Sequence, residues 1–360
     1  MRVLMDGGQA NNRSGTGRHV VELCAALATM PEAEGWTVLC PPGFNPGERF
    51  RRFSLPGHSL ARQAALRMRL RKWCESSGAD VLYFPSSTAL TRVPRSMAMQ
   101  IHDLCYLIRP EWFPPLRRAW YRISVEGPAR RADLVLVDSQ STADDVCRKL
   151  GIPEERVAVV YLGVANRFHP LSSEEVLRVR RELGCPDGYF LFVGTLEPRK
   201  NLPRLARAWD RVTEATGLPL VIAGRRGWGC RDWDETLRNL QHRPLLTGHV
   251  AEGRLAALMG AATALVWPSL MEGFGLPPLE AMACGTPVIT SNRSSMPEIC
   301  GDAAVLINPE SEDELAEAMR AVAADAAWRE RLRSAGLRRA AAFTWEACAR
   351  GTVEVLSRLG

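Results

Sequence analysis

Two glutamates eight positions apart bracket a glycine turn within residues 264–290. Glu272 comes directly before Gly273, and Glu280 lies in an apolar run with helical spacing that follows Gly275. A carboxylate has two acceptor oxygens, which suit the adjacent hydroxyls of a ribose or of a hexose. One glutamate can therefore hold a ribose and the other a sugar ring. Taken singly, the residues leave an alternative open, in which both are ordinary solvated charges.

The segments around this turn predict a strand, a turn and a short helix. Residues Ala264–Trp267 form an apolar run of the kind found in parallel strands that are covered on both faces. A helix is expected to begin at Pro277 and Pro278, which tolerate a missing N–H, and to end at Gly285. This order brings backbone N–H groups and the positive end of a helix to the carboxyl edge of a sheet, so we expect an anion there.

The whole stretch resembles the E-x7-E signature of the retaining glycosyltransferases of family four, the group 1 family with the GT-B fold. Members often read EGFGLPxLEAMAxGxPV, and this chain reads EGFGLPPLEAMACGTPV. The resemblance implies that Glu280 holds the nucleotide ribose and that Glu272 holds hydroxyls of the donor sugar. The backbone amides of Phe274, Gly275 and Leu276 would then hold sugar and phosphate.

A second motif, FVGTLEPRKN, places Arg199 and Lys200 just after an apolar run, where two cations can neutralise a diphosphate. It resembles the family's phosphate-binding Arg and Lys. Many members carry Arg directly after the glycine that corresponds to Gly194, whereas this chain has Thr195. Lys200 therefore matches the usual lysine, and Arg199 is expected to replace the missing arginine. The alternative is a solvated charged turn. On this reading the enzyme needs no metal and no other cofactor.

Two further strand ends are candidates for the same site. His102 ends an apolar run and resembles the HDL motif of a mannosyltransferase-like branch, in which the histidine lies by the donor sugar. A histidine with only a structural role is the alternative. His249 and Val250 follow a glycine and are similar to the family's loop that borders the nucleotide base.

The loop GGQANNRSGTGR connects the first expected strand to a helical pattern at 19–28. Gly15 and Gly17 only half match the dinucleotide fingerprint, because Val20 stands where the next glycine is expected, so a nicotinamide cofactor is not predicted. In GT-B enzymes the equivalent loop faces the cleft near the donor phosphates. Gly15 and Gly17 are therefore donor-site candidates, with a plain flexible connection as the alternative.

The tripeptide Asp232-Trp233-Asp234 spells the D-x-D pattern with which GT-A enzymes hold a metal. It opens a charged helical segment, and no second group of ligands stands near it in the sequence. We interpret it as a chance match and predict no metal site.

The length of 360 residues suits two domains, and strands alternate with helices in both halves. We predict an α/β GT-B fold with two Rossmann-like, doubly wound domains that face a cleft. The expected parts are an acceptor-binding domain at 1–170, a nucleotide-sugar-binding domain at 171–344, and a helix at 345–360 that returns to the first domain.

The location of the protein in the cell is predicted from its N-terminus, its apolar runs and its cysteines. The N-terminus MRVLMDGGQ has no apolar core of a secretory signal, and no apolar run approaches about 18 residues. The ten cysteines show no C-x-x-C pair, so we expect reduced core residues. These features favour the cytosol.

The net charge is +6 and is unevenly placed. Residues 49–72 hold eight Arg or Lys and no acid, and a second basic stretch at 109–131 carries Trp112, Phe113, Trp120 and Tyr121. Such a mixture is typical of a protein that docks on an anionic membrane, here the inner face of the cytoplasmic membrane. A solvated arginine-rich surface is the alternative. No nucleic-acid-binding motif accompanies the charge, so no nucleic acid partner is predicted.

The resemblance thus implies a retaining hexosyltransferase that moves a sugar from a nucleotide diphosphate to a glycan or lipid-linked acceptor. Mannose from GDP-mannose is favoured, because HDL together with GTLEPRKN resembles mannosyltransferases. Two rivals share these residues: a GT-B sugar-nucleotide epimerase or hydrolase, and a non-catalytic scaffold that binds the sugar nucleotide.

Overall fold

The computed structural model describes residues 1–12, 14–86, 95–184, 186 and 188–360. The chain divides into two compact units. The first comprises Met1–Pro110, Pro114–Gly163 and Thr344–Gly360, and the second comprises Glu111–Phe113 and Val164–Phe343. The C-terminal segment therefore belongs to the first unit, as the resemblance to GT-B enzymes predicted.

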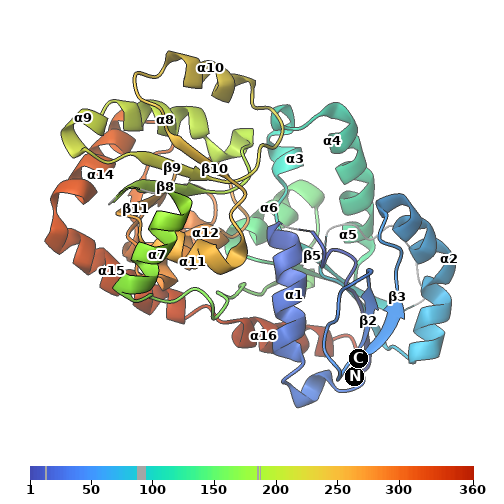
Figure 1. The fold of residues 1–360 in the computed structure, drawn as a ribbon. Helices are drawn as coiled ribbons and strands as arrows, with labels where there is room; N and C mark the ends of the chain where they lie inside the picture. Colours follow the sequence, from blue (N-terminus) through green and yellow to red (C-terminus); the bar gives the residue numbers. More distant parts are fainter. Residues whose placement is uncertain (13, 87–94, 185, 187) are drawn as a thin grey trace. The chain divides into compact units, whose positions relative to one another are not determined.

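The first unit is built on a seven-stranded parallel sheet with the order β3-β2-β1-β4-β5-β6-β7. The numbering runs outward from β1 in both directions, which is the doubly wound arrangement (Figure 1). The strands are β1 (Val3–Asp6), β2 (Thr37–Cys40), β3 (Arg51–Ser54), β4 (Val81–Phe84), β5 (Ser96–Ile101), β6 (Leu134–Val137) and β7 (Val157–Val159).

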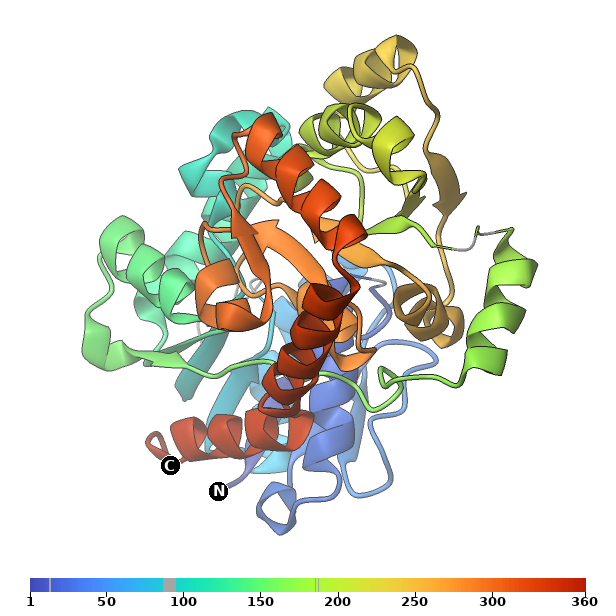
Figure 2. The same cartoon turned by 90° about the vertical axis from the view of Figure 1, so that its left-hand side faces the viewer.

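Helices cover both faces of this sheet. Helix α16 (Trp345–Ser357) packs beside α1 (Gly15–Leu27) in both views (Figures 1 and 2). The two chain ends lie side by side, with Gly360 against Met1. On the other face are α2 (Ser59–Ser77), α4 (Pro115–Tyr121) and α5 (Gly127–Arg131). The remaining helices are α3 (Cys105–Ile108) and α6 (Gln140–Leu150).

The second unit has a six-stranded parallel sheet with the order β10-β9-β8-β11-β12-β13. The strand order reverses between β8 and β11, so their carboxyl ends form the switch point at which open α/β sheets bind ligands. The strands are β8 (Phe190–Val193), β9 (Leu220–Ala223), β10 (Leu245–Gly248), β11 (Ala264–Trp267), β12 (Val288–Ser291) and β13 (Val305–Ile307).

The helices of the second unit follow the sequence pattern closely. Helix α7 (Ser173–Leu183) begins with a capping box between Ser172 and Glu175. The others are α8 (Leu202–Asp210), α9 (Thr213–Thr216), α10 (Arg231–Asn239), α11 (Glu252–Gly260), α12 (Leu276–Ala283), α13 (Met296–Cys300), α14 (Glu312–Ala324) and α15 (Ala326–Ala341).

Two details differ from the sequence-based expectations. Strand β3 was not predicted: it lies inside the first basic stretch, three of its four residues are exposed, and it forms an edge of the sheet. Of the four aromatics assigned to a membrane face, only Trp120 is exposed, at 40%. Tyr121 stacks on Tyr106 with ring centroids 5.3 Å apart, and Trp112 and Phe113 belong to the second unit.

Among the residues described, no helix is long and apolar enough to cross a membrane. Nine of the cysteines are described, and each of these is a free thiol.

Candidate active site

The second unit carries a buried ionic cluster at the switch point between β8 and β11. The Lys200 ammonium donates to one carboxylate oxygen of Glu272 at 2.6 Å, and the Arg199 guanidinium donates to the other at 2.5 Å. Glu272 is 6% exposed and Lys200 is 6% exposed. The Ser269 hydroxyl also donates to the Glu272 carboxylate. The sequence motifs that predicted phosphate binding and sugar binding are therefore joined in one cluster.

Local structure explains how these side chains converge. Arg199 and Lys200 lie in a 3₁₀ turn, η5 (Pro198–Lys200), which is separated from the end of β8 by four residues, while Ser269 and Glu272 follow β11. Parallel neighbouring strands bring both loops to the same edge of the sheet. Asn201 closes η5 in the left-handed region with φ of +60°, and its side-chain amide donates to the Pro309 carbonyl at 2.7 Å.

The charges in the cluster act on one another. Burial raises the pKa of Glu272, but the charges of Arg199 and Lys200 outweigh it, so the pKa lies below the usual range and the carboxylate is ionised. Burial and the charge of Arg199 lower the pKa of Lys200, while Glu272 acts in the opposite direction. Arg199 also donates to Glu197 at 2.6 Å. The cluster thus pairs the side chains of two acidic residues, Glu197 and Glu272, with those of two basic residues, Arg199 and Lys200.

Helix α12 presents its N-terminus beside this cluster. Its N-cap, Gly275, has φ of +106°, and a Cβ there would collide with the side chain of Met296, so only glycine fits. The first amides of the helix have no carbonyl one turn earlier to bond within the helix. Phe274 and Leu276 are buried on either side of Gly275. This turn has the geometry of an anion site.

A pair of serines fixes the backbone of Glu272. Ser294 donates to the Glu272 carbonyl at 2.5 Å, and Ser295 donates to the same carbonyl at 3.0 Å. Ser295 also donates to the Phe274 carbonyl at 2.9 Å. Both serines lie in the turn after β12, so a third strand end supports the glycine turn.

Glu280 lies inside α12 and is 2% exposed. This excludes the alternative of a solvated helix residue. A buried carboxylate on the helix that begins at the glycine turn is a suitable partner for a polar ligand group in the same region.

The remaining donor-site candidates of the second unit lie at the same sheet edge. Gly194 and Thr195 directly follow β8, and the Gly194 amide donates to the Ala223 carbonyl at 2.9 Å. His249 is exposed and Val250 half-buried after β10, which is two strands away from β8 in the sheet.

In the first unit, His102 belongs to a buried polar chain across three strand ends. Its Nδ1 lies 2.7 Å from Asp138 Oδ2, and its Nε2 lies 3.1 Å from the Pro85 carbonyl oxygen. Gln100 donates to the other Asp138 oxygen at 2.6 Å and accepts from the Tyr83 hydroxyl at 2.7 Å. A carboxylate and a carbonyl only accept, so both ring nitrogens of His102 carry protons and the ring is a cation.

The pKa of His102 agrees with this geometry. Burial lowers it, but the charge and hydrogen bond of Asp138 outweigh burial and leave the pKa above the usual value. His19, from α1, meets His102 edge to face at 5.2 Å and stacks on Trp345 at 5.9 Å. Burial, with the nearby His102, lowers the pKa of His19 to about 3. The environments of the two rings therefore shift their pKa values in opposite directions, upward for His102 and downward for His19.

Gly15 and Gly17 lie in the first turn of α1 and not in the preceding loop. A Cβ on Gly17 would collide with the Asn12 carbonyl, so this glycine serves the close packing of the loop on the helix. Arg13 of the same loop lies outside the described residues. The expectation that Gly15 and Gly17 contact a donor phosphate remains a prediction.

The D-x-D tripeptide lies at the start of α10, where Asp234 accepts from Arg226 at 2.6 Å and Trp233 is buried. In the part of the chain that the structure describes, no group of three or more His, Cys, Asp or Glu side chains is arranged to hold a metal ion.

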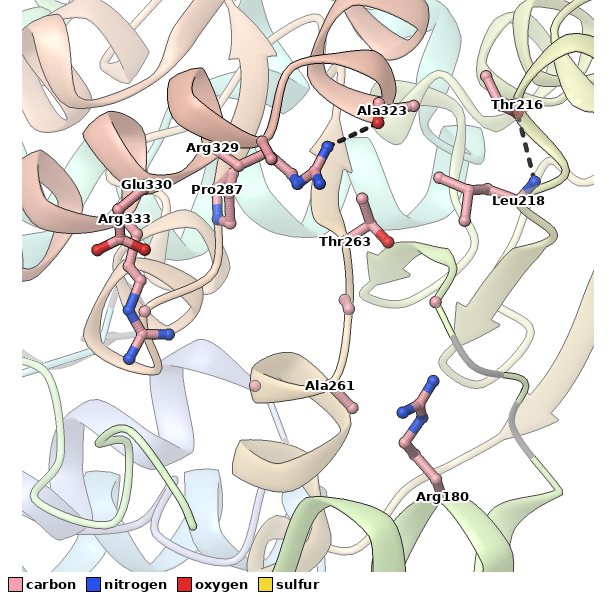
Figure 3. A pocket seen from close by; sticks show the side chains of 15 residues that line it. Arg180, Thr216, Leu218, Ala261, Thr263, Pro287, Ala323, Arg329, Glu330 and Arg333 are labelled. Carbon is pink, nitrogen blue, oxygen red and sulfur yellow. Dashed lines mark hydrogen bonds between the residues drawn. The ribbon is translucent and has the colours of Figure 1, made fainter. Parts of the chain in front are cut away.

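A cavity of about 490 Å³ lies at the opposite, amino edge of the second sheet (Figure 3). Arg180, Arg329 and Arg333 line it. Arg329 donates to the carbonyls of Val322 and Ala323 at 2.8 and 2.6 Å, so it caps the end of α14. This cavity is separate from the ionic cluster and takes no part in the candidate site.

Several of these residues were not identified from sequence. Ser269, Ser294 and Ser295 carry no spacing signal of their own, because they act through backbone and carboxylate contacts. Asp138 was also not identified as a partner of His102; it lies directly before Ser139, which caps α6 by accepting from the Thr142 amide at 3.2 Å. The only signal for Asp138 in the sequence was its place directly after an apolar run.

Known protein families match both units. The model for glycosyl transferases group 1 matches residues 176–339, and the model for glycosyltransferase family 4 matches residues 13–167. The O-antigen chain mannosyltransferase B of Escherichia coli is 31% identical over 303 residues, which are 82% of this chain and 78% of that protein. The serotype-specific mannosyltransferase WbdA of Escherichia coli is 30% identical over 279 residues, covering 74% of this chain and 34% of WbdA.

Solved structures share the fold. HepE from Anabaena, solved in complex with UDP and glucose, matches with a TM-score of 0.77 at 22% identity over 100% of both chains. WaaG, a glycosyltransferase involved in lipopolysaccharide biosynthesis, matches with a TM-score of 0.76 at 16% identity over 99% of this chain and 100% of WaaG. The architecture is therefore GT-B, as the sequence predicted.

Proposed function

Because the chain belongs to the group 1 family of glycosyltransferases, we propose that it is a retaining hexosyltransferase. It would move a sugar from a nucleotide diphosphate to a hydroxyl of a glycan or lipid-linked acceptor. The observation that carries this proposal is the cluster in which Glu272 holds both Arg199 and Lys200 beside the glycine turn of α12.

The cluster suggests an exchange of partners when the donor binds. The diphosphate brings negative charge to Arg199, Lys200 and the amides of the α12 N-terminus, all of which favour anions. Once phosphate oxygens take over the two cations, the Glu272 carboxylate is released to accept from hydroxyls of the donor sugar. Glu280, buried in the same helix, would accept from the ribose hydroxyls.

In the transfer step, the acceptor oxygen bonds to the anomeric carbon on the face from which the diphosphate departs. The bond between that carbon and the phosphate oxygen breaks, and a leaving phosphate oxygen takes the acceptor proton. Lys200 and Arg199 stabilise the charge that develops on the leaving group, so the proposal needs no metal. We assign Glu272 no role as a nucleophile, because attack by the acceptor on the face of the leaving group forms no bond between the sugar and the protein.

We assign His102 the role of a fixed positive charge near the donor sugar, which acts through its charge and not through a hydrogen bond. Both ring nitrogens face acceptors, and a protonated imidazole cannot take a proton as a general base.

GDP-mannose is the donor that we favour, because the HDL and GTLEPRKN motifs resemble mannosyltransferases and relatives over most of the chain carry that name. Glucose, rhamnose and N-acetylglucosamine with other nucleotides are the competing donors. We also propose a lipid-linked glycan acceptor at the cytoplasmic face of a membrane, supported by the basic stretches of the first unit.

Nucleotide release from a panel of nucleotide sugars, measured with and without acceptor glycans, tests the proposal. Acceptor-dependent release of GDP from GDP-mannose is expected, with the product linkage keeping the anomeric configuration of the donor. Release without an acceptor would favour the epimerase or hydrolase. Binding without release would favour a scaffold, and a covalent sugar trapped on Glu272 would contradict front-face attack.

A further inference from the structure

Helix α4 and the π-helical turn that continues it, Arg122–Glu126, carry apolar side chains on two opposite sides. The inner side faces the first unit: Tyr121 stacks on Tyr106, and Val125 is 1% exposed. This inner stripe anchors the helix to its own core.

The outer side holds a second apolar stripe, which we call the outer ridge. It consists of Leu116, Trp120 and Ile123, whose spacings of four and three place them on one side of the helix. Leu116 is 87% exposed, Trp120 40% and Ile123 66%. A helix that packs on a core by one stripe normally places polar residues opposite it. The fold itself therefore gives no reason for the outer ridge.

The charge around the outer ridge is positive. Arg117 and Arg122 are exposed beside it, and residues 109–131 contain six arginines and two glutamates. Aliphatic side chains with a tryptophan, flanked by arginines, have the composition of interfacial membrane helices. A protein partner could also cover an apolar ridge. The excess of arginines over glutamates in residues 109–131, which persists although Glu126 pairs with Arg122 and Arg130, favours an anionic surface.

We propose that the outer ridge inserts into the headgroup region of an anionic lipid bilayer, with the neighbouring arginines on the lipid phosphates. Helix α2, on the same side of the first sheet, adds exposed Leu60 and Met68 at 72% and 81% (Figure 1). That this membrane also carries the acceptor rests on the proposed function. The insertion itself depends only on the outer ridge and the residues around it.

Flotation of the full chain with vesicles tests the proposal. Vesicles of phosphatidylglycerol and phosphatidylcholine are compared with pure phosphatidylcholine at low and high salt. We expect binding to the anionic vesicles that weakens with salt, by about fivefold for each arginine neutralised in Arg117→Gln and Arg122→Gln. The double variant Leu116→Ser with Ile123→Ser should lower binding by at least about tenfold at unchanged charge.

A matched control is Leu246→Ser, which removes an apolar side chain with 49% exposure from edge strand β10 of the second unit. It should leave vesicle binding unchanged. Equal binding by wild type and the outer-ridge double variant, or no preference for anionic vesicles, would overturn the proposal. The proposal would also be overturned, in favour of self-association, if the wild type sediments as a dimer and does not bind vesicles, while the double variant sediments as a monomer.

Catalysis is measured on the same proteins with a soluble acceptor, because the outer ridge has no part in the ionic cluster. Loss of vesicle binding with unchanged nucleotide release supports the docking surface. Absent vesicle binding with normal transfer would refute docking alone, and absent transfer with normal vesicle binding would refute the proposed function alone.

Discussion

The Lys200 ammonium lies 2.6 Å from Glu272 and, at the same time, 4.2 Å from the centre of the Trp267 ring. A cation held between a carboxylate and an aromatic face is stabilised without water, which explains how a lysine that is 6% exposed keeps a defined position. The same carboxylate competes with any phosphate that approaches this lysine. The sugar-binding and phosphate-binding functions proposed for the cluster are therefore coupled through Glu272.

The first prediction tests that coupling with Glu272→Gln, which keeps the shape of the side chain and removes its charge. Turnover should fall by about 100-fold or more, the usual effect of removing one contact that stabilises a transition state. Affinity for GDP or UDP without the sugar should stay equal or rise, because Arg199 and Lys200 lose a competing acceptor. Calorimetric titration with GDP and UDP gives the diphosphate affinity, and initial rates give the turnover.

Glu310→Gln serves as the control for this prediction. Glu310 pairs with Arg293 at 3.6 Å on the surface, and its side chain is 59% exposed. Neither the turnover nor the diphosphate affinity should therefore change in Glu310→Gln. If Glu272→Gln lost diphosphate affinity as strongly as turnover, the exchange of partners would be wrong.

The second prediction concerns Glu280. Glu280→Ala should weaken nucleotide diphosphate binding by about 10- to 100-fold, which corresponds to a lost hydrogen bond to a charged acceptor. The deoxy analogue of the nucleotide provides a matched ligand. Wild-type protein should prefer the ribonucleotide, and Glu280→Ala should show no preference. A preference that survives in the variant would assign the ribose to another residue.

The third prediction compares two glycines by thermal or urea unfolding. Gly275→Ala should destabilise the second unit by more than about 1 kcal/mol, because φ of +106° strains any residue with a Cβ and the buried end of the Met296 side chain would also have to move. Gly253→Ala, inside α11 with no atom within 4 Å of the new methyl, should instead stabilise by about 0.5 to 1 kcal/mol. The same sign for both variants would contradict the strain at the glycine turn.

Much of the fold follows from local sequence because buried parallel strands are short apolar runs. Strands β2, β4, β6, β9 and β11 begin and end where those runs do. Edge strand β3 was hidden because three of its four residues are exposed and two are arginines. The sequence of β3 has neither a continuous apolar run nor an alternation of apolar and polar residues from which a strand could be predicted. Its strand structure is decided by its pairing with β2.

The candidate site was predictable where a motif lies within one loop. Glu272, Gly275 and Glu280 lie together because the turn and α12 are contiguous in sequence. The pairing of Asp138 with His102 depends on β5 and β6 being neighbours, which local patterns do not specify. Ser269 was missed for a related reason, since its role exists only when β8 and β11 lie side by side.

The last prediction follows from the charged His102 and its partner Asp138. The folded pKa of His102 is raised above the unfolded value of about 6.5, so the protonated ring stabilises the fold. This stability is fully present below about pH 6.5 and is lost as the pH rises through the folded pKa. The difference in unfolding free energy between wild type and His102→Gln should therefore shrink from pH 6 to pH 8.5.

Asp138→Asn removes the charge that raises the pKa of His102, and burial, which lowers it, then dominates. The His102 ring signal in NMR spectra should titrate at lower pH than in wild type, and the pH dependence of stability should reverse. Tyr83→Phe is the control, because it removes the far end of the hydrogen-bond chain and keeps the carboxylate. Its titration should stay close to wild type, and an Asp138→Asn protein with an unshifted His102 signal would show that Asp138 does not hold the proton.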